Sequence, residues 1–306
     1  MDKLKQMQAF VAAVELGSLS RAAQAVGVSA AMLGRRVDAL ERRLGVKLLH
    51  RSTRHQALTE EGQLFFERCR RVFAEVELAE ELMSSSRESA VGHLRVTAPA
   101  GFGRRHVAAH AASFLEANPR VQLSFDLTDQ VVDVVREGYD VGIRIGAVAD
   151  TDLVAIRLAA NRRAVCATPD YLGRHGTPRD LTDLPHHNCL VFTPQGGQSG
   201  GWSFLRDGKP VTVRVHGNPD CNDGEMLHRW SRAGLGLAWR STWEIQRELN
   251  RGELVTVLDE FALPDYDVRA VYPQQRHIPA KVRFFVEHLK RIYGMPGYWD
   301  TQWSVL

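Results

Sequence analysis

Cysteine is scarce and scattered in this chain. Its 306 residues include four cysteines and no CxxC pair, at Cys69, Cys166, Cys189 and Cys221. A zinc site or a disulfide framework needs closer or patterned spacing, so we expect each thiol to behave as a small apolar side chain. A redox-sensing pair is the alternative that the pattern leaves open.

Long apolar runs and nucleotide-binding glycine motifs are also missing. No apolar run approaches the ~18 residues of a membrane span, and the first ten residues lack the apolar stretch of a signal peptide. Neither GxGxxG nor GxxxxGK followed by Ser or Thr occurs, so the sequence does not support a nucleotide cofactor. We therefore expect a cytoplasmic protein with no cofactor and no membrane partner.

What the chain does have is a basic N-terminal segment. Residues 1–60 hold ten Lys and Arg against five Asp and Glu, a net charge of +5, whereas the whole chain carries +3. The remaining residues are therefore close to neutral, with a net charge of −2. This asymmetry indicates an anionic partner for the N-terminal segment alone, although a solvated charged surface would give the same count.

Three helices and a hairpin are predicted for the basic segment. Apolar residues recur at helical spacing over residues 4–16, and Ser18 and Ser29 are good N-caps for two further helices. Gly27 lies in the short turn between those two, which predicts a helix-turn-helix. Beyond Gly45, short apolar pieces flank the polar sequence HRSTRH, which predicts a hairpin, or wing, whose tip suits phosphate oxygens.

The third helix begins with small side chains and continues with arginines. In a recognition helix the N-terminal residues face base edges in the major groove, where alanine methyls reach thymine and arginine reaches guanine or phosphate. Further along, Arg42 and Arg43 are expected to pair with Glu41 or to face water. The predicted DNA contacts are Ser18, Arg21, Ser29, Ala30, Ala31, Met32, Gly34, Arg35, Arg36, Arg51, Ser52, Thr53 and Arg54.

A long helix is predicted from about Glu60 to Ser86, and the serine-rich sequence at 84–92 predicts a hinge after it. One face of the helix carries an apolar heptad stripe, which is typical of pairing between chains. Packing onto the helix's own domain is the alternative. The stripe, and with it the predicted dimer contact, consists of Phe65, Cys69, Val72, Val76, Ala79 and Met83.

From His93 onward the predicted strands and helices alternate, which indicates an α/β domain with a largely parallel sheet. HLRVTA and VQLSFDL predict strands with a helix between them, and residues 129–146 predict a helix and then a strand. The chain enters a second lobe near residues 157–172 and returns near residues 265–275. Two lobes with two crossovers predict a cleft for a small ligand; a final amphipathic helix is expected over 279–293.

One set of residues in segment 4–62 has a characteristic order and spacing: Phe10, Gly17, Ser18, Ala22, Ala23, Val28, Ser29, Leu40, Glu41, Leu44, Gly45, Leu48, Arg51, Leu58, Thr59, Glu61 and Gly62. Through these residues the segment resembles the DNA-binding domain of LysR-type transcriptional regulators. The resemblance continues more weakly through Gly138-Tyr139-Asp140, the run Cys166–Leu172 and Ala233–Gly236, so it spans nearly the whole chain. Gly34 departs from the family, which more often has serine there.

The resemblance implies a two-part α+β chain. A winged helix-turn-helix and a long linker helix are followed by a two-lobed α/β effector domain like a periplasmic binding protein. Such a protein binds promoter DNA as a dimer or tetramer, is switched by a small effector and is not an enzyme. The implied divisions are 1–59 for DNA binding, 60–91 for the linker, and 92–306 for the effector domain, with lobe I about 92–161 and 267–306 and lobe II about 162–266.

The effector contacts are expected between the lobes. The loop from Ala98 to Gly103 opens a helix whose free N–H groups suit a carboxylate, but it lacks the family's usual hydroxyl, which favours a more apolar effector. Thr128 is either an effector contact or a turn cap, and Arg144 either faces the cleft or pairs with an acid such as Asp140. The contacts taken over from the family are Pro99, Ala100, Gly101, Phe102, Thr128, Ile145, Gly146, Cys221 and Asn222.

Two patterns would point to catalysis or metal binding instead. Residues 197–201 match GxSxG, but a nucleophile elbow needs a strand before it and a helix after it, and a loop and a predicted hairpin flank this one. His106 and His110 lie four residues apart without the glutamate of HExxH. We therefore expect no catalytic residue and no metal. A constitutive architectural DNA binder remains an alternative, and it would leave the predicted cleft unused.

Overall fold

The computed structural model describes residues 2–51, 56–83, 89–148, 150–193, 201–264, 266–275 and 277–301. The chain divides into two compact units. The small unit is residues 1–87 with 136–138, and the large unit is residues 88–135 with 139–306. Within the described ranges, no helix combines the length and the apolar character needed to cross a bilayer.

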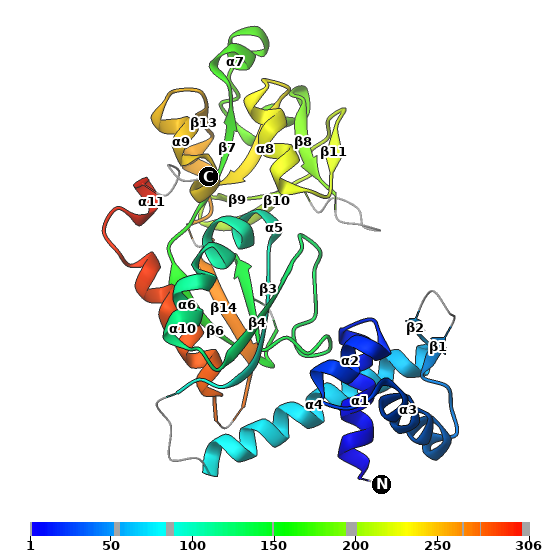
Figure 1. Ribbon diagram of the computed structural model, residues 1–306. Helices are drawn as coiled ribbons and strands as arrows, with labels where there is room; N and C mark the ends of the chain where they lie inside the picture. Colours follow the sequence, from blue (N-terminus) through cyan, green and yellow to red (C-terminus); the bar gives the residue numbers. More distant parts are fainter. Residues whose placement is uncertain are drawn as a thin grey trace. The chain divides into compact units, whose positions relative to one another are not determined.

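The small unit consists of helices and one hairpin (Figure 1). Ser18 Oγ accepts a hydrogen bond from Arg21 N (3.5 Å), and Ser29 Oγ accepts one from Met32 N (3.2 Å). Both serines therefore cap the helices that follow them, as predicted. The elements are α1 (Lys3–Glu15), α2 (Leu19–Ala25), α3 (Ala30–Leu44), β1 (Leu49–Arg51), β2 (Gln56–Leu58) and α4 (Glu60–Met83). The wing tip, 52–55, and the hinge residues 84–88 lie outside the described residues.

Aromatic packing around Phe10 forms the core of the small unit. The Phe10 ring lies 5.9 Å from the Phe65 ring and 6.4 Å from the Phe66 ring, and Cys69 is fully buried in the same cluster. Phe65 and Cys69 therefore pack onto their own unit, which is the alternative to pairing between chains. Of the rest of the stripe, Val72 and Ala79 are exposed, Val76 is half-buried, and Met83 ends α4.

The wing and α4 are joined by hydrogen bonds around Thr59. Its hydroxyl donates to Lys47 O (2.7 Å) and accepts from Gly62 N (2.8 Å), while Thr59 N donates to Leu48 O (3.0 Å). A Cβ at Gly62 would lie 2.0 Å from Leu48 O. The backbones of the helix and the wing therefore meet too closely for any residue but glycine at position 62.

The large unit has two lobes, each built on a five-stranded sheet (Figure 1). In lobe I the strand order is β4-β3-β5-β14-β6, with β3 (Gly92–Ala98), β4 (Val121–Leu127), β5 (Val141–Ile145), β6 (Leu153–Ala159) and β14 (Val268–Pro273). In lobe II the order is β11-β8-β12-β7-β13, with β7 (Arg163–Ala167), β8 (Cys189–Phe192), β11 (Asp220–Cys221), β12 (Leu237–Ser241) and β13 (Val255–Val257). The predicted hairpin is β9 (Trp202–Arg206) with β10 (Lys209–Val213).

The expectation of largely parallel sheets is wrong, because both sheets are mixed. β3 pairs in parallel with β4 and β5, but β14 runs antiparallel to both β5 and β6. In lobe II, β8 pairs in parallel with β11 and β12, while β7 is antiparallel to β12 and β13. The chain leaves lobe I along β6 and returns along β14, so these two neighbouring strands must run in opposite directions.

Helices cover the sheets, with one departure from the prediction. Residues 129–138 form turns and extended backbone rather than a helix. Four residues of this segment are β-branched valines with low helix propensity, and Gly138 has φ of 66°, which stops helical continuation. The helices are α5 (Ala100–Phe102), α6 (Ala111–Ala117), α7 (Pro169–His175), α8 (Gly224–Arg232), α9 (Thr242–Asn250), α10 (Ala280–Tyr293) and α11 (Tyr298–Thr301), with less regular turns at Gly103–Val107, Ala108–His110, Leu181–His186 and Asp259–Phe261.

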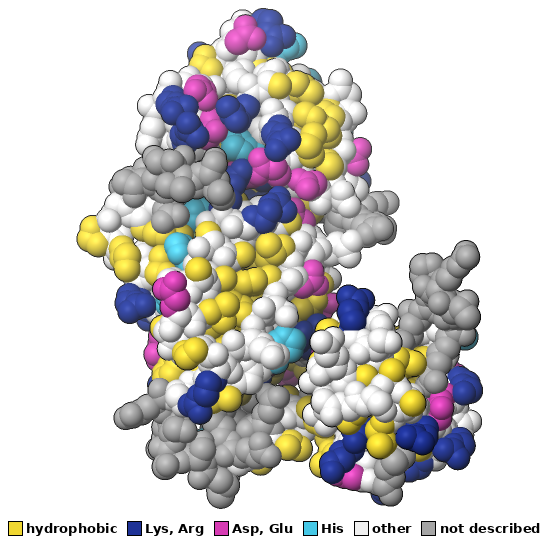
Figure 2. Space-filling model, viewed as in Figure 1, with side chains coloured by type: hydrophobic (Ala, Val, Ile, Leu, Met, Phe, Trp, Pro, Cys, Tyr) yellow, Lys and Arg dark blue, Asp and Glu magenta, His cyan; other side chains and the backbone are white. Residues whose placement is uncertain are grey.

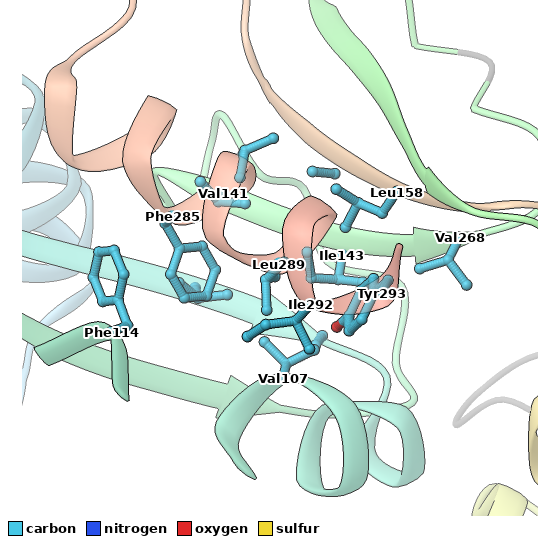
Figure 3. Packing of buried hydrophobic residues seen from close by; sticks show 14 of the residues in the cluster. Val107, Phe114, Val141, Ile143, Leu158, Val268, Phe285, Leu289, Ile292 and Tyr293 are labelled. Carbon is cyan, nitrogen blue, oxygen red and sulfur yellow. The ribbon is translucent and has the colours of Figure 1, made fainter. Parts of the chain in front are cut away.

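The core of lobe I lies between its sheet and α10, the amphipathic helix predicted at 279–293. Figure 3 shows Phe114 beside Phe285, with Leu289 and Ile292 of α10 facing the strand residues. The Phe114 and Phe285 rings meet edge to face at 5.1 Å. In lobe II, Trp202 is buried in the main core cluster and Phe192 is partly buried against a second cluster.

We predict that Gly62→Ala destabilises the small unit by about 1–3 kcal/mol, the usual range for overpacking. Helix propensity alone would favour alanine by about 1 kcal/mol, so the contact with Leu48 O decides the sign. Pulsed hydrogen exchange along a urea series, read on peptides from residues 2–83, measures the unfolding free energy of this unit in the full-length protein.

Gly34→Ala is the matched control. Gly34 also lies inside a helix, but a Cβ there would meet nothing within 4 Å. This change should stabilise the unit by about 0.5–1 kcal/mol. Equal effects of the two substitutions would contradict the proposed role of Gly62.

Candidate DNA-binding face and effector site

The first turn of α3 presents the small side chains predicted to face DNA. Ser29, Ala30, Ala31 and Met32 are exposed, whereas Leu33 is fully buried and anchors the helix to the core. Arg35 is exposed one turn later, and Gly34 and Arg36 are half-buried, as is Ser18; Arg21 is exposed. Most of the predicted contacts on the helices are therefore accessible from solvent.

The arginines of α3 fall into two groups. Arg42 Nε donates to Asp38 O (3.3 Å) and Arg43 Nε to Gln6 Oε1 (3.1 Å), so both bind within the unit and neither pairs with Glu41. Within the described ranges, Arg35 makes no hydrogen bond or ion pair, so its guanidinium is free to bind an external anion. Figure 2 shows Lys and Arg side chains on the surface over α3.

Glu41 fixes the wing to α3. Its carboxylate is 3% exposed and accepts from Leu48 N (3.0 Å), Leu49 N (3.1 Å) and Lys47 Nζ (2.7 Å). Burial alone would raise the pKa of Glu41, but these three hydrogen bonds outweigh it and hold the pKa below its ordinary value. Arg51 is the last residue of β1, two residues after Leu49. Ser52, Thr53 and Arg54 lie outside the described residues.

In the large unit, one carboxylate bridges the two lobes. Asp129 Oδ1 accepts from Ala100 N (2.8 Å) at the start of α5, and Asp129 Oδ2 accepts from Gly224 N (3.0 Å) at the start of α8. Both N–H groups belong to first helical turns, which have no partner within their own helix. The loop expected to offer free N–H groups to an effector therefore already gives one to Asp129.

Further contacts join the lobes around this carboxylate. Arg105 of lobe I forms an ion pair with Glu225 of α8. The Phe102 ring meets the Trp243 ring of α9 edge to face at 5.1 Å. Phe102 and Ala100 are buried, whereas Pro99 and Gly101 are half-buried. Of the predicted loop residues, Phe102 therefore packs between lobes rather than lying open to a ligand.

The other predicted effector residues are spread around the junction. Thr128 Oγ1 accepts from Gln130 N (3.2 Å), which is the turn-cap arrangement. Gly146 has φ of 101°, and a Cβ there would lie 2.7 Å from Tyr266 Cε1. Ile145 packs against the lobe I core, Cys221 ends β11, and Asn222 is exposed just before α8.

Several functional candidates were missed by the sequence analysis. They are Asp129, which directly follows Thr128, and Arg163, which begins lobe II. For Arg163 the sequence offered one signal, the pair of arginines at 162–163 beside the expected crossover. Arg144, for which two roles were considered, donates to Ile143 O (2.9 Å) and Val132 O (3.1 Å). Asp140 accepts from Arg95 N (2.8 Å) and lies 3.3 Å from Lys281 Nζ.

His106 and three of the four cysteines are buried. His106 Nδ1 and His110 Nε2 both bond the Tyr298 hydroxyl, at 3.1 and 2.9 Å, and burial lowers the pKa of His106 to about 3. All four cysteines are free thiols. Burial raises the pKa values of Cys69, Cys166 and Cys189 to about 12, which disfavours the reactive thiolate. Ser199 of the GxSxG match lies outside the described residues.

Comparison with known proteins assigns the family. Residues 4–63 match the bacterial regulatory helix-turn-helix protein, lysR family, and residues 87–293 match the LysR substrate binding domain. The chain belongs to the LysR-type transcriptional regulators. This confirms the resemblance inferred from the sequence, together with the winged helix-turn-helix and two-lobed effector-domain architecture.

Full-length relatives share both parts. The HTH-type transcriptional regulator DmlR of Escherichia coli (strain K12) is 36% identical over 291 residues, which cover 95% of this chain and 94% of DmlR. The solved structure of CrgA from Neisseria meningitidis is 31% identical with a TM-score of 0.57, covering 95% of this chain and 98% of that one. Full-length AphB, a Vibrio cholerae virulence activator, is 26% identical with a TM-score of 0.58, covering 94% and 98%.

We predict that Glu41→Gln destabilises the small unit of this LysR-type regulator by about 1–3 kcal/mol near pH 7, since buried N–H groups lose a charged acceptor. Because the folded-state pKa is lowered, the contribution of Glu41 is present above the ordinary glutamate pKa and is lost as pH falls through about 4 and below. The difference between variant and wild type should therefore shrink in acid.

Pulsed hydrogen exchange in urea, repeated between pH 7 and about pH 3, measures this difference. Glu61→Gln is the control, because Glu61 is exposed on the first turn of α4; it should change stability by less than about 0.5 kcal/mol. A Glu41→Gln effect that stays constant with pH would contradict the role of the charge.

Proposed function

We propose that this LysR-type regulator binds promoter DNA through the first turn of α3, Arg35 and the wing, as a homodimer or homotetramer. A small organic effector, bound between the lobes of the large unit, changes that binding. The protein acts in the cytoplasm as a regulator and has no catalytic reaction of its own.

The observation that carries this proposal is that the arginines of α3 differ in their contacts within the protein. Its first turn exposes small side chains that allow close approach to base edges. Arg35 has no partner among the described residues, whereas Arg42 and Arg43 are held by Asp38 and Gln6. A helix whose arginines were needed only for solubility would not separate them in this way.

The oligomer is proposed on α4. With Phe65 and Cys69 packed inside their own unit, the stripe residues whose burial the structure describes and that keep surface for pairing are Val72, Val76 and Ala79. Two such helices, one from each chain, would cover these side chains and set the spacing of two recognition helices along the DNA.

The test is fluorescence anisotropy of the full-length protein on the duplex upstream of its own gene, across a salt series, beside a scrambled duplex. We predict that Arg35→Ala lowers the affinity about tenfold and, where it contacts phosphate, reduces the slope of log K against log salt by about 1. Arg42→Ala is the control and should leave affinity and slope unchanged. Wild-type affinity and slope in Arg35→Ala would contradict the docking of α3.

A further inference from the structure

Arg163 is a cation held by aromatic rings at the junction of the two lobes. It begins β7, directly after the chain has left lobe I. Its guanidinium carbon lies 4.4 Å from the centre of the Trp239 ring and 5.1 Å from that of the Tyr266 ring, and the two rings meet edge to face. Stacking of this kind fixes the plane of a guanidinium while leaving its N–H fork unused.

The neighbouring acids are already engaged. Glu244 accepts two hydrogen bonds from Arg240, both of 2.7 Å, and Asp129 accepts from the backbones of α5 and α8. Within the described part of the chain, no carboxylate oxygen lies within 4.0 Å of the Arg163 guanidinium, and its buried Nε has no hydrogen-bond partner. The residue as a whole is half-buried, although its Nε has no exposed surface.

A half-buried cation without a counter-charge is energetically unfavourable. Burial lowers the pKa of the Arg163 guanidinium and the positive charge of Arg240 acts in the same direction, whereas Tyr266, Glu244 and Asp129 act against this shift without outweighing it. Arginine nevertheless stays protonated at neutral pH. A carboxylate brought by a ligand would supply both the missing charge and the missing hydrogen-bond acceptor.

The surroundings of Arg163 connect it to the expected effector site. Tyr266 lies two residues before β14, the strand by which the chain returns to lobe I, and its ring packs against the backbone of Gly146, a predicted effector residue. Asn161 Nδ2 donates to Tyr266 O (2.9 Å), which ties the two crossovers together beside Arg163. Asp129 and Arg240 are close enough to act on Arg163 electrostatically.

We propose that Arg163 recognises a carboxylate of the effector, and hence that the effector is an organic acid. This inference rests on the proposed function, because it names the chemical class of the molecule bound between the lobes. The guanidinium fork holds a carboxylate through two parallel N–H···O hydrogen bonds. The loop Pro99–Gly101 adds no side-chain hydroxyl, so the rest of the effector is predominantly apolar.

The test is calorimetric titration of the full-length protein with acetate, succinate, malate and benzoate, each beside its neutral amide, at constant ionic strength. We expect at least one acid to bind wild type at least about tenfold more tightly than its amide, because a charge-assisted bidentate pair is lost with the charge. Arg163→Gln should weaken binding of that acid by about tenfold or more.

Two variants control for folding and for general charge. Arg162→Gln is the matched control, since Arg162 is the preceding residue and is exposed, with its charge directed to Asp259 at 3.5 Å; it should bind the acid as wild type does. Arg163→Lys keeps the charge without the fork and should retain the preference for acid over amide at reduced affinity. A thermal melt of each variant verifies that it is folded.

Three results would overturn the inference: no acid of the panel binds wild type, an amide binds as tightly as its acid, or the acid binds Arg163→Gln unchanged. The anisotropy assay separates this failure from failure of the proposed function. If the protein binds DNA sequence-specifically but binds no acid, only the inference of an organic-acid effector is refuted. Acid binding without any preference for the native duplex removes the proposed DNA function alone.

Discussion

The Asp129 carboxylate joins the two lobes of the large unit, and much of the site around it depends on this one bridge. Its two oxygens accept from the first N–H groups of α5 and α8, which come from different lobes. Both helix ends carry positive partial charge, so an anion between them allows a close approach that they would otherwise resist. Glycine at 224 also leaves room for a lobe II side chain, because a Cβ there would lie 2.9 Å from Arg240 Nη2.

The bridge also determines which acids at the junction are left to pair with an arginine. With Asp129 engaged by backbone and Glu244 by Arg240, the stacked Arg163 has no acid of its own. The small unit uses a buried carboxylate in a similar way, since Glu41 accepts from the backbone of the wing and so links it to the recognition helix. In each unit a buried or bridging acid is engaged by backbone N–H groups, near the arginine that we propose binds an external anion.

The sequence predicted the small unit well because its signals are local. Ser18 and Ser29 act within one turn of the chain, and their caps form as predicted. The sequence could not show that β14 returns antiparallel to β6, because that pairing joins strands more than a hundred residues apart. The helix expected at residues 129–138 followed apolar periodicity, but these residues form turns stabilised by bonds such as Tyr139 N to Val134 O.

The site was harder to predict than the fold. The family resemblance pointed to loops that lie at the junction of the lobes, but Phe102 packs against Trp243 and Thr128 caps a turn. The roles of Asp129 and Arg163 depend on partners that are distant in sequence. Asp129 binds Gly224, and Arg163 stacks on Trp239 and Tyr266. No spacing rule connects these positions, because two separate crossovers bring them together.

Residue-resolved hydrogen exchange of Asp129→Ala in the full-length protein tests the interlobe bridge most directly. The account predicts that the amides of Ala100 and Gly224 both exchange faster than in wild type, since a single side chain protects them in different lobes. Asp170→Ala, which removes an exposed acid paired with Arg174, should leave both amides unchanged. Protection retained at either amide in Asp129→Ala would contradict a bridge made by this one carboxylate.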